Sequence, residues 1–104
     1  MSRVEQPVAN AVRGEAAIAG FVLRPSFGAL VAAEAELGPL FALVERAAEG
    51  RLTLGETVAL FWHCLADRPE GLDREGFGEA VAGAGLAAMA PVLRVLLGQI
   101  LKGQ

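Results

Sequence analysis

The chain contains one cysteine and one histidine, and the two are adjacent. Since an intramolecular disulfide needs two cysteines, none can form, which suits a reducing cytoplasm. On a helix, His63 and Cys64 point about 100° apart, so they cannot hold one metal ion together. His63 and Asp67 share a face, but two ligands do not make a zinc site. We therefore expect no metal site and no cysteine nucleophile, only a surface histidine beside a half-buried thiol.

Basic residues and long hydrophobic runs are also scarce. Nine Lys and Arg side chains are scattered along the chain against twelve acidic ones, giving a net charge of −3. Nucleic-acid surfaces need clustered basic side chains, so no binding to DNA or RNA is expected. The longest apolar stretch, Leu86 to Leu101, is interrupted by Pro91, Arg94 and Gln99. It is also shorter than the ~20 residues of a membrane span, so no membrane association is predicted.

No catalytic or cofactor-binding pattern stands out. Gly83-Ala84-Gly85 begins a run that resembles the dinucleotide-binding pattern, but a helical segment precedes it where that motif needs a strand. A helix break is the simpler interpretation. Glu34 and Glu36 lie two apart and so diverge on a helix, which excludes a paired acid–base role. Glu34 is either a rim carboxylate or the partner of Arg13 or Arg24 in an ion pair. We expect no enzyme and no cofactor.

The composition is that of one folded domain. Hydrophobic residues make up 54% of the 104 residues and charged residues 20%. Chains of this length bury roughly 65% of their unfolded surface, enough for one core. The first residues are polar and without periodicity, and they lack the apolar core of a signal peptide. We predict a flexible N-terminal arm over residues 1–12 and a single domain over residues 13–104.

The hydrophobic period changes at Arg24-Pro25-Ser26. Before it, Arg13 to Leu23 is typical of a short hairpin, with Gly20 supplying the positive φ of its turn. After it, nearly every segment has helical spacing. Capping residues and breaks place the helices at 27–37, at 39–49, after Thr53, after Asp73 and at 86–102. The predicted fold is mainly α: a short N-terminal β-hairpin followed by a compact bundle of four to five helices.

The spacing also predicts which side chains are buried. The helix at 27–37 is expected to pack through one side, formed by Phe27, Leu30, Val31 and Leu37. The helix after Thr53 has the broadest apolar stripe, formed by Leu54, Val58, Phe61, Trp62 and Leu65. Trp62 is expected to be largely buried beside Phe61. Pro91 is expected either to kink the last helix or to mark its start.

The last helix is apolar on more than one stripe. Such a helix either lies at the centre of a bundle or is partly covered by a partner. Under the second interpretation, the expected partner contacts are Leu93, Leu97, Ile100 and Leu101.

Several local patterns together resemble a known family. They are Arg13-Gly14-Glu15, the helix entry Leu23 to Leu30, the acidic-and-alanine run Ala33 to Gly38, and Leu40 to Arg46. These segments resemble the small tail protein of gene transfer agents and related tailed phages of alphaproteobacteria. That family is usually classed as a tail assembly chaperone and has also been labelled a tail tube protein.

The resemblance implies a partner and a location. A chaperone of this kind binds the tape measure protein in the bacterial cytoplasm and yields it to tail tube subunits. Because a tube lining needs several long strands, the single alanine-rich hairpin favours the chaperone over the tube component. A structural tail component and an unrelated helical interaction module remain alternatives, and the oligomeric state is open.

Overall fold

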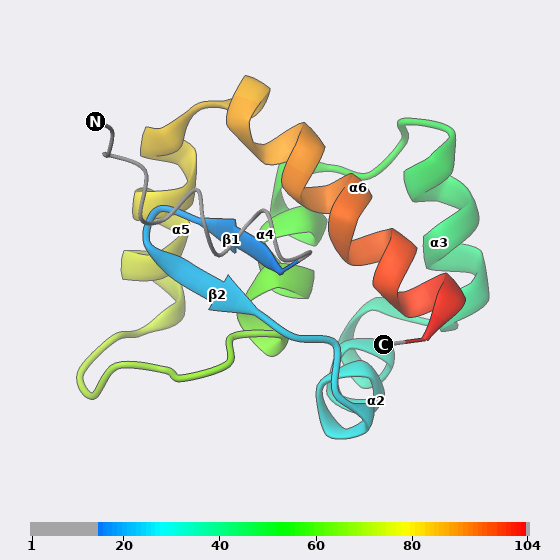
Figure 1. Ribbon diagram of the computed structural model, residues 1–104, viewed down its shortest axis with the longest axis horizontal. Helices are drawn as coiled ribbons and strands as arrows, with labels where there is room; N and C mark the ends of the chain where they lie inside the picture. The colour runs from blue at the N-terminus through cyan, green and yellow to red at the C-terminus, as the bar shows by residue number, and fades with distance from the viewer. Residues whose placement is uncertain (1–14, 104) are drawn as a thin grey trace.

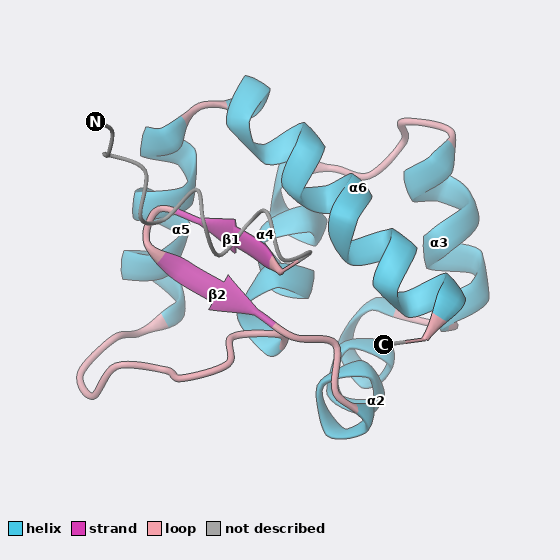
Figure 2. Ribbon diagram, viewed as in Figure 1, coloured by secondary structure: helices cyan, strands magenta, loops and turns pink. Residues whose placement is uncertain are grey.

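The computed structural model describes residues 15–103 of the chain. Within that range two strands and five helices follow one another (Figure 1, Figure 2). Their order is β1 (Ala16–Ile18), β2 (Phe21–Leu23), α2 (Phe27–Leu37), α3 (Leu40–Ala48), α4 (Leu54–His63), α5 (Arg74–Ala84) and α6 (Leu86–Lys102). The predicted class, mainly α with a short N-terminal hairpin, is confirmed. The predicted arm over residues 1–12 lies outside the described residues.

The hairpin is closed by the two-residue turn Ala19-Gly20. Both residues have positive φ, 53° and 83°, which matches the right-handed twist of a two-residue hairpin. The left-handed conformation costs an alanine about 1 kcal/mol, so tertiary contacts must hold the turn. The segment after α4 holds the second strand: the backbone N–H of Ala66 donates to the Val22 carbonyl oxygen at 2.9 Å. The hairpin is thereby fixed to the helical body.

Three capping side chains begin helices where the sequence predicts. Ser26 accepts a hydrogen bond from the backbone of α2, and Asp73 does the same for α5. Thr53 and Glu56 form the predicted capping box at the start of α4. Between α2 and α3, the Gly38-Pro39 break turns the chain by 82°. These caps and breaks fix where the helices begin and where the chain turns.

The core lies between the hairpin and the helices. In Figure 1, α4 and α5 lie behind the hairpin and α6 runs alongside β1. Every described element contributes at least one buried hydrophobic side chain. The largest fully buried side chains are Phe61, Phe77, Leu23, Leu43, Leu60, Leu96, Val81 and Cys64.

Three predictions about burial are wrong. Phe27 is 84% exposed, and Val31 and Leu54 are each 48% exposed. In α2 the buried face is instead centred on Ala33, because a small side chain lets α2 approach α4 closely. Trp62 is partly buried and packs against the core, while Phe61 is fully buried.

Pro91 lies inside α6 and does not mark its start. The helix continues through it, although the missing N–H leaves the Ala87 carbonyl without its usual partner within the helix. Buried residues on both sides of the proline, Met89 and Leu96, hold the helix against the rest of the fold. Among the described residues no single helix combines the length and hydropathy of a membrane span, although the bent pairs α2–α3 and α5–α6 reach them jointly.

Candidate functional site: two hollows along the last helix

The four predicted partner contacts lie on α6 in three different environments. Leu97 is 9% exposed and belongs to the buried residues, whereas Leu101 is 65% exposed. Leu93 and Ile100 are partly buried and pack against the core. The four side chains therefore do not form one surface. Leu93 and Ile100 instead line two separate hollows, one beside each half of the helix.

The first hollow, here called the α6 groove, lies between the first turns of α4 and α6. It encloses about 250 Å³. Its lining residues are Leu52, Leu54, Thr57, Leu86, Met89, Ala90 and Leu93. Leu54 is 48% exposed and Leu86 is 69% exposed, so two leucines stand open to solvent at its edge. The groove is thus a hydrophobic surface already shaped as a hollow.

The chemistry of the α6 groove suits an apolar ligand. Its one polar side chain, Thr57, is buried, and its hydroxyl donates to the Thr53 carbonyl oxygen at 3.0 Å. That hydroxyl therefore already has an acceptor. Met89 forms part of the lining, and its flexible thioether side chain can adapt to ligands of different shape. A ligand in the groove would therefore be held mainly by burial of hydrophobic area and not by hydrogen bonds to side chains.

Sequence reasoning named Leu93 but did not predict that Leu54 and Leu86 line the same groove. Both residues are the first of their helices, α4 and α6. The helical period assigned Leu54 to the core stripe, yet a side chain in a first turn often extends past the neighbouring helix. Their position directly after Thr53 and Gly85, the two capping residues, was the available signal.

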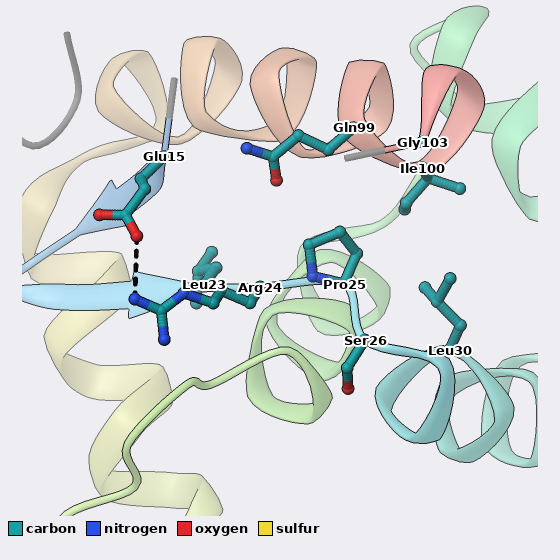
Figure 3. Close-up of a pocket in the computed structure, with 9 residues that line it drawn as sticks. All are labelled: Glu15, Leu23, Arg24, Pro25, Ser26, Leu30, Gln99, Ile100 and Gly103. Atoms are coloured by element: carbon teal, nitrogen blue, oxygen red, sulfur yellow. Dashed lines mark hydrogen bonds and ion pairs between the residues drawn. The ribbon is translucent and has the colours of Figure 1, made fainter. Parts of the chain in front are cut away.

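The second hollow, here called the hairpin cleft, lies between the end of β2, the start of α2 and the end of α6 (Figure 3). It encloses about 480 Å³. Figure 3 shows Ile100 and Leu30 approaching it from α6 and α2, while Glu15 and Arg24 form an ion pair of 2.9 Å at its other side. The cleft is therefore polar at one end and apolar at the other.

The Arg24 ion pair excludes one of the two partners considered for Glu34. Arg24 pairs with Glu15, and Glu34 instead accepts a hydrogen bond from the backbone N–H of Leu40 at 2.9 Å. Glu34 is thus an exposed carboxylate that holds the start of α3. Arg13, the other predicted partner, lies outside the described residues.

A third feature, here called the polar corner, consists of Glu36, Trp62, His63 and Arg74. Arg74 donates twice to the Glu36 carboxylate, at 2.7 and 3.0 Å, and His63 Nε2 lies 2.7 Å from the same carboxylate. The hydrogen bonds from Arg74 and then His63 lower the pKa of Glu36 to about 2. The guanidinium of Arg74 lies 5.7 Å from the centre of the Trp62 ring. This cluster joins α2, α4 and α5.

The remaining chemical candidates do not form a site. Cys64, expected to be half-buried, is fully buried, and that burial raises the pKa of its thiol to about 12, which makes it a poor nucleophile. Residues 15–103 contain no group of three His, Cys, Asp or Glu side chains that could hold a metal ion. Gly83 and Ala84 end α5, and Gly85 with φ 95° breaks the chain before α6. The helix-break interpretation of that glycine motif is therefore confirmed.

Comparison with known proteins decides the family. The family model described as phage tail tube protein, GTA-gp10, matches residues 9–103. The chain belongs to this family. It is therefore a phage tail protein of the kind associated with gene transfer agents, as the sequence resemblance indicated, and the unrelated helical module is excluded. Neither a curated protein nor a solved structure matches the chain.

Proposed function

We propose that this protein is a tail assembly chaperone that binds an apolar helix of the tape measure protein in the α6 groove. The observation that carries the proposal is the groove itself, where Leu54 and Leu86 are left open beside a preformed apolar hollow. An amphipathic helix laid into such a groove buries its apolar face and the exposed leucines together. The tape measure protein enters as the partner from the family resemblance.

The chemistry of the groove determines how binding and release would work. The contact is hydrophobic, so its affinity should depend only weakly on salt, unlike binding to nucleic acid. No catalytic step or cofactor is part of the proposal. Release follows when tail tube subunits compete for the tape measure protein in the bacterial cytoplasm. The chaperone thus protects its client and does no chemistry on it.

A structural role in the tail is the second candidate, because the family description itself names a tail tube protein. A tube lining is a closed ring of long strands. In the described part of the chain, β1 and β2 have three residues each. Such short strands favour the chaperone. Mass spectrometry of purified particles separates the two functions, since a tube component must be present in many copies per particle.

Capture of the tape measure protein tests the proposal. The tagged protein is co-expressed with the tape measure protein, and the amount retained is measured for the wild type and for the Leu86→Asp variant. We expect Leu86→Asp to lose most of the capture while its circular dichroism spectrum is unchanged, because Leu86 is 69% exposed. Full capture by this variant would contradict the proposal.

A matched control separates loss of the groove from a general effect of surface charge. Phe41 on α3 is 85% exposed and lines neither hollow. The Phe41→Asp variant should capture the tape measure protein as well as the wild type does. Equal loss in both variants would show that the groove is not the specific contact.

A further inference from the structure

A further hollow, here called the acidic hollow, lies between α4 and α5, which pack side by side behind the hairpin (Figure 1). It encloses about 410 Å³. Its lining residues are Leu54, Gly55, Val58, Arg74, Glu75, Gly78, Glu79 and Ala82. Leu54 also lines the α6 groove, so the two hollows meet at this exposed side chain.

Two contacts show that α4 and α5 run antiparallel along the acidic hollow. A Cβ atom built on Gly78 would lie 3.6 Å from Val58 Cγ1. One turn further along α4, the Trp62 ring lies beside Arg74, one turn back along α5. Gly78 has no side chain with which to cover Val58, and Val58 is partly exposed. The bottom of the hollow is therefore apolar.

The edge of the acidic hollow carries negative charge that the described chain does not compensate. Glu75 and Glu79 are exposed, and within residues 15–103 neither side chain forms a hydrogen bond or an ion pair. Arg74, the basic side chain of the lining, already donates to the Glu36 carboxylate at 2.7 and 3.0 Å. The helix dipole favours Glu75 in the first turn of α5. Glu79 lies one turn further on, beyond that benefit, and is repelled by Glu75 at four-residue spacing.

We propose that the acidic hollow holds a basic side chain, Lys or Arg, of the same amphipathic helix that fills the α6 groove. The inference rests on the proposed function, because the two hollows meet at Leu54 and one helix can lie across both. The stem of a Lys or Arg packs on apolar surface such as Val58, while its charged end reaches the carboxylates at the edge. An acidic side chain would instead meet two like charges. The partner is thus an apolar helix with a basic residue at one end.

The positions of the lining residues give the spacing expected in the partner. Along α4, Val58 lies one turn beyond Leu54, about 6 Å along the helix axis. A partner helix laid along α4 therefore carries its basic residue about one turn, or three to four residues, from the apolar residue that covers Leu54. This spacing distinguishes the binding segment from other apolar helices of the tape measure protein.

Capture of the tape measure protein at increasing salt tests the inference. At about 0.05 M NaCl, Glu79→Arg should retain several-fold less than the wild type, and the difference should shrink at about 0.5 M, where charges are screened. Glu79→Arg should fold normally, because glutamate followed by arginine at four-residue spacing favours a helix. Since only one or two charges take part, the salt dependence stays far smaller than that of nucleic-acid binding.

The matched control makes the same change of charge elsewhere. Glu45 on α3 is exposed and lines none of the three hollows. Glu45→Arg should therefore capture the tape measure protein as well as the wild type does. Wild-type capture by Glu79→Arg at low salt, or an equal loss in Glu45→Arg, overturns the inference.

Filling the hollow gives a second test that does not depend on charge. Gly78→Leu places a side chain over Val58, and leucine favours a helix more than glycine does. We expect this variant to keep its melting temperature and to capture several-fold less tape measure protein at every salt concentration. Gly28→Leu, at an exposed helical glycine of α2 outside the hollows, should capture normally. Unchanged capture by Gly78→Leu contradicts the inference.

The inference and the proposed function fail in different ways. Loss of capture in Leu86→Asp but not in Glu79→Arg leaves the α6 groove as the contact and overturns the role of the acidic hollow. Loss in Glu79→Arg and Gly78→Leu but not in Leu86→Asp overturns the proposed groove and leaves the acidic hollow as the contact.

Discussion

The polar corner and the α6 groove both lie where helices meet at the surface. They differ in whether their side chains already have partners within the chain. In the polar corner the Glu36 carboxylate is bound by both Arg74 and His63. In the α6 groove Leu54 and Leu86 are exposed beside a hollow. A satisfied polar cluster fixes helices in place, whereas exposed apolar area is worth about 25 cal/mol per Å² once a partner covers it. We therefore attribute a structural role to the corner and propose the groove as the binding surface.

The largest expected effect is a difference in the free energy of unfolding between core and groove variants of α6. Leu97 is 9% exposed and Leu86 is 69% exposed on the same helix. Leu97→Asp should lower the free energy of unfolding by about 4 kcal/mol or more, because it buries an unpaired charge. Leu86→Asp should change it by less than about 0.5 kcal/mol. Urea denaturation measures both values, and similar losses in the two variants would show that the groove edge is part of the core.

The next effect concerns the polar corner. Trp62 packs on Phe77, with ring centres 5.9 Å apart, and Arg68 lies 4.0 Å above its ring. Full burial of a tryptophan would give about 3–5 kcal/mol for Trp62→Ala, and partial exposure reduces this to about 2–3 kcal/mol. Thermal or urea unfolding checks the value. If Trp62→Ala instead keeps full stability but loses capture of the tape measure protein, the corner is a binding surface and our assignment is wrong.

Interactions between residues close together in the sequence could be predicted, whereas those between distant segments could not. Ser26, Thr53 and Asp73 cap helices through hydrogen bonds to residues three positions on, so local patterns predicted the helix starts. The sequence did not predict the buried face of α2, because Ala33 is buried in place of the larger Phe27 only when α2 packs on α4. The helical period shows which face of a helix is most hydrophobic. It does not show where a neighbouring helix requires a small side chain.

The sites depend on contacts between distant segments. Glu36 and Arg74 are 38 positions apart, so their pairing needs the whole fold, and the sequence favoured Glu34 instead. The α6 groove likewise forms only where the starts of α4 and α6 meet. The surplus of apolar stripes on the last helix could be read from the sequence and drew attention to α6. Which of its leucines are open to solvent could not be read from it.

The smallest expected effect is the acid dependence of the polar corner. The pKa of Glu36 is lowered from 4.5 to about 2 in the folded chain. Its contribution to stability is therefore present above about pH 4.5 and is lost as the pH falls toward 2. Since the side chain is 39% exposed, screening keeps this contribution below about 1 kcal/mol.

Melting temperatures measured from pH 7 to pH 2 check this prediction. Glu36→Gln should lower the melting temperature at pH 7 and converge with the wild type at low pH. Arg74→Gln should give a similar curve, because it removes the same ion pair, and the double variant should add little. Additive losses would indicate that the two side chains act separately.

Photo-cross-linking from the α6 groove tests the central claim most directly. A photoreactive phenylalanine analogue replaces Leu86 in one variant and Phe41 in another, and each is co-expressed with the tape measure protein and irradiated. Position 86 should form a covalent adduct with a helical segment of the tape measure protein, and position 41 should form none. An adduct at position 41 alone, or none at either position while capture persists, would contradict binding through the groove.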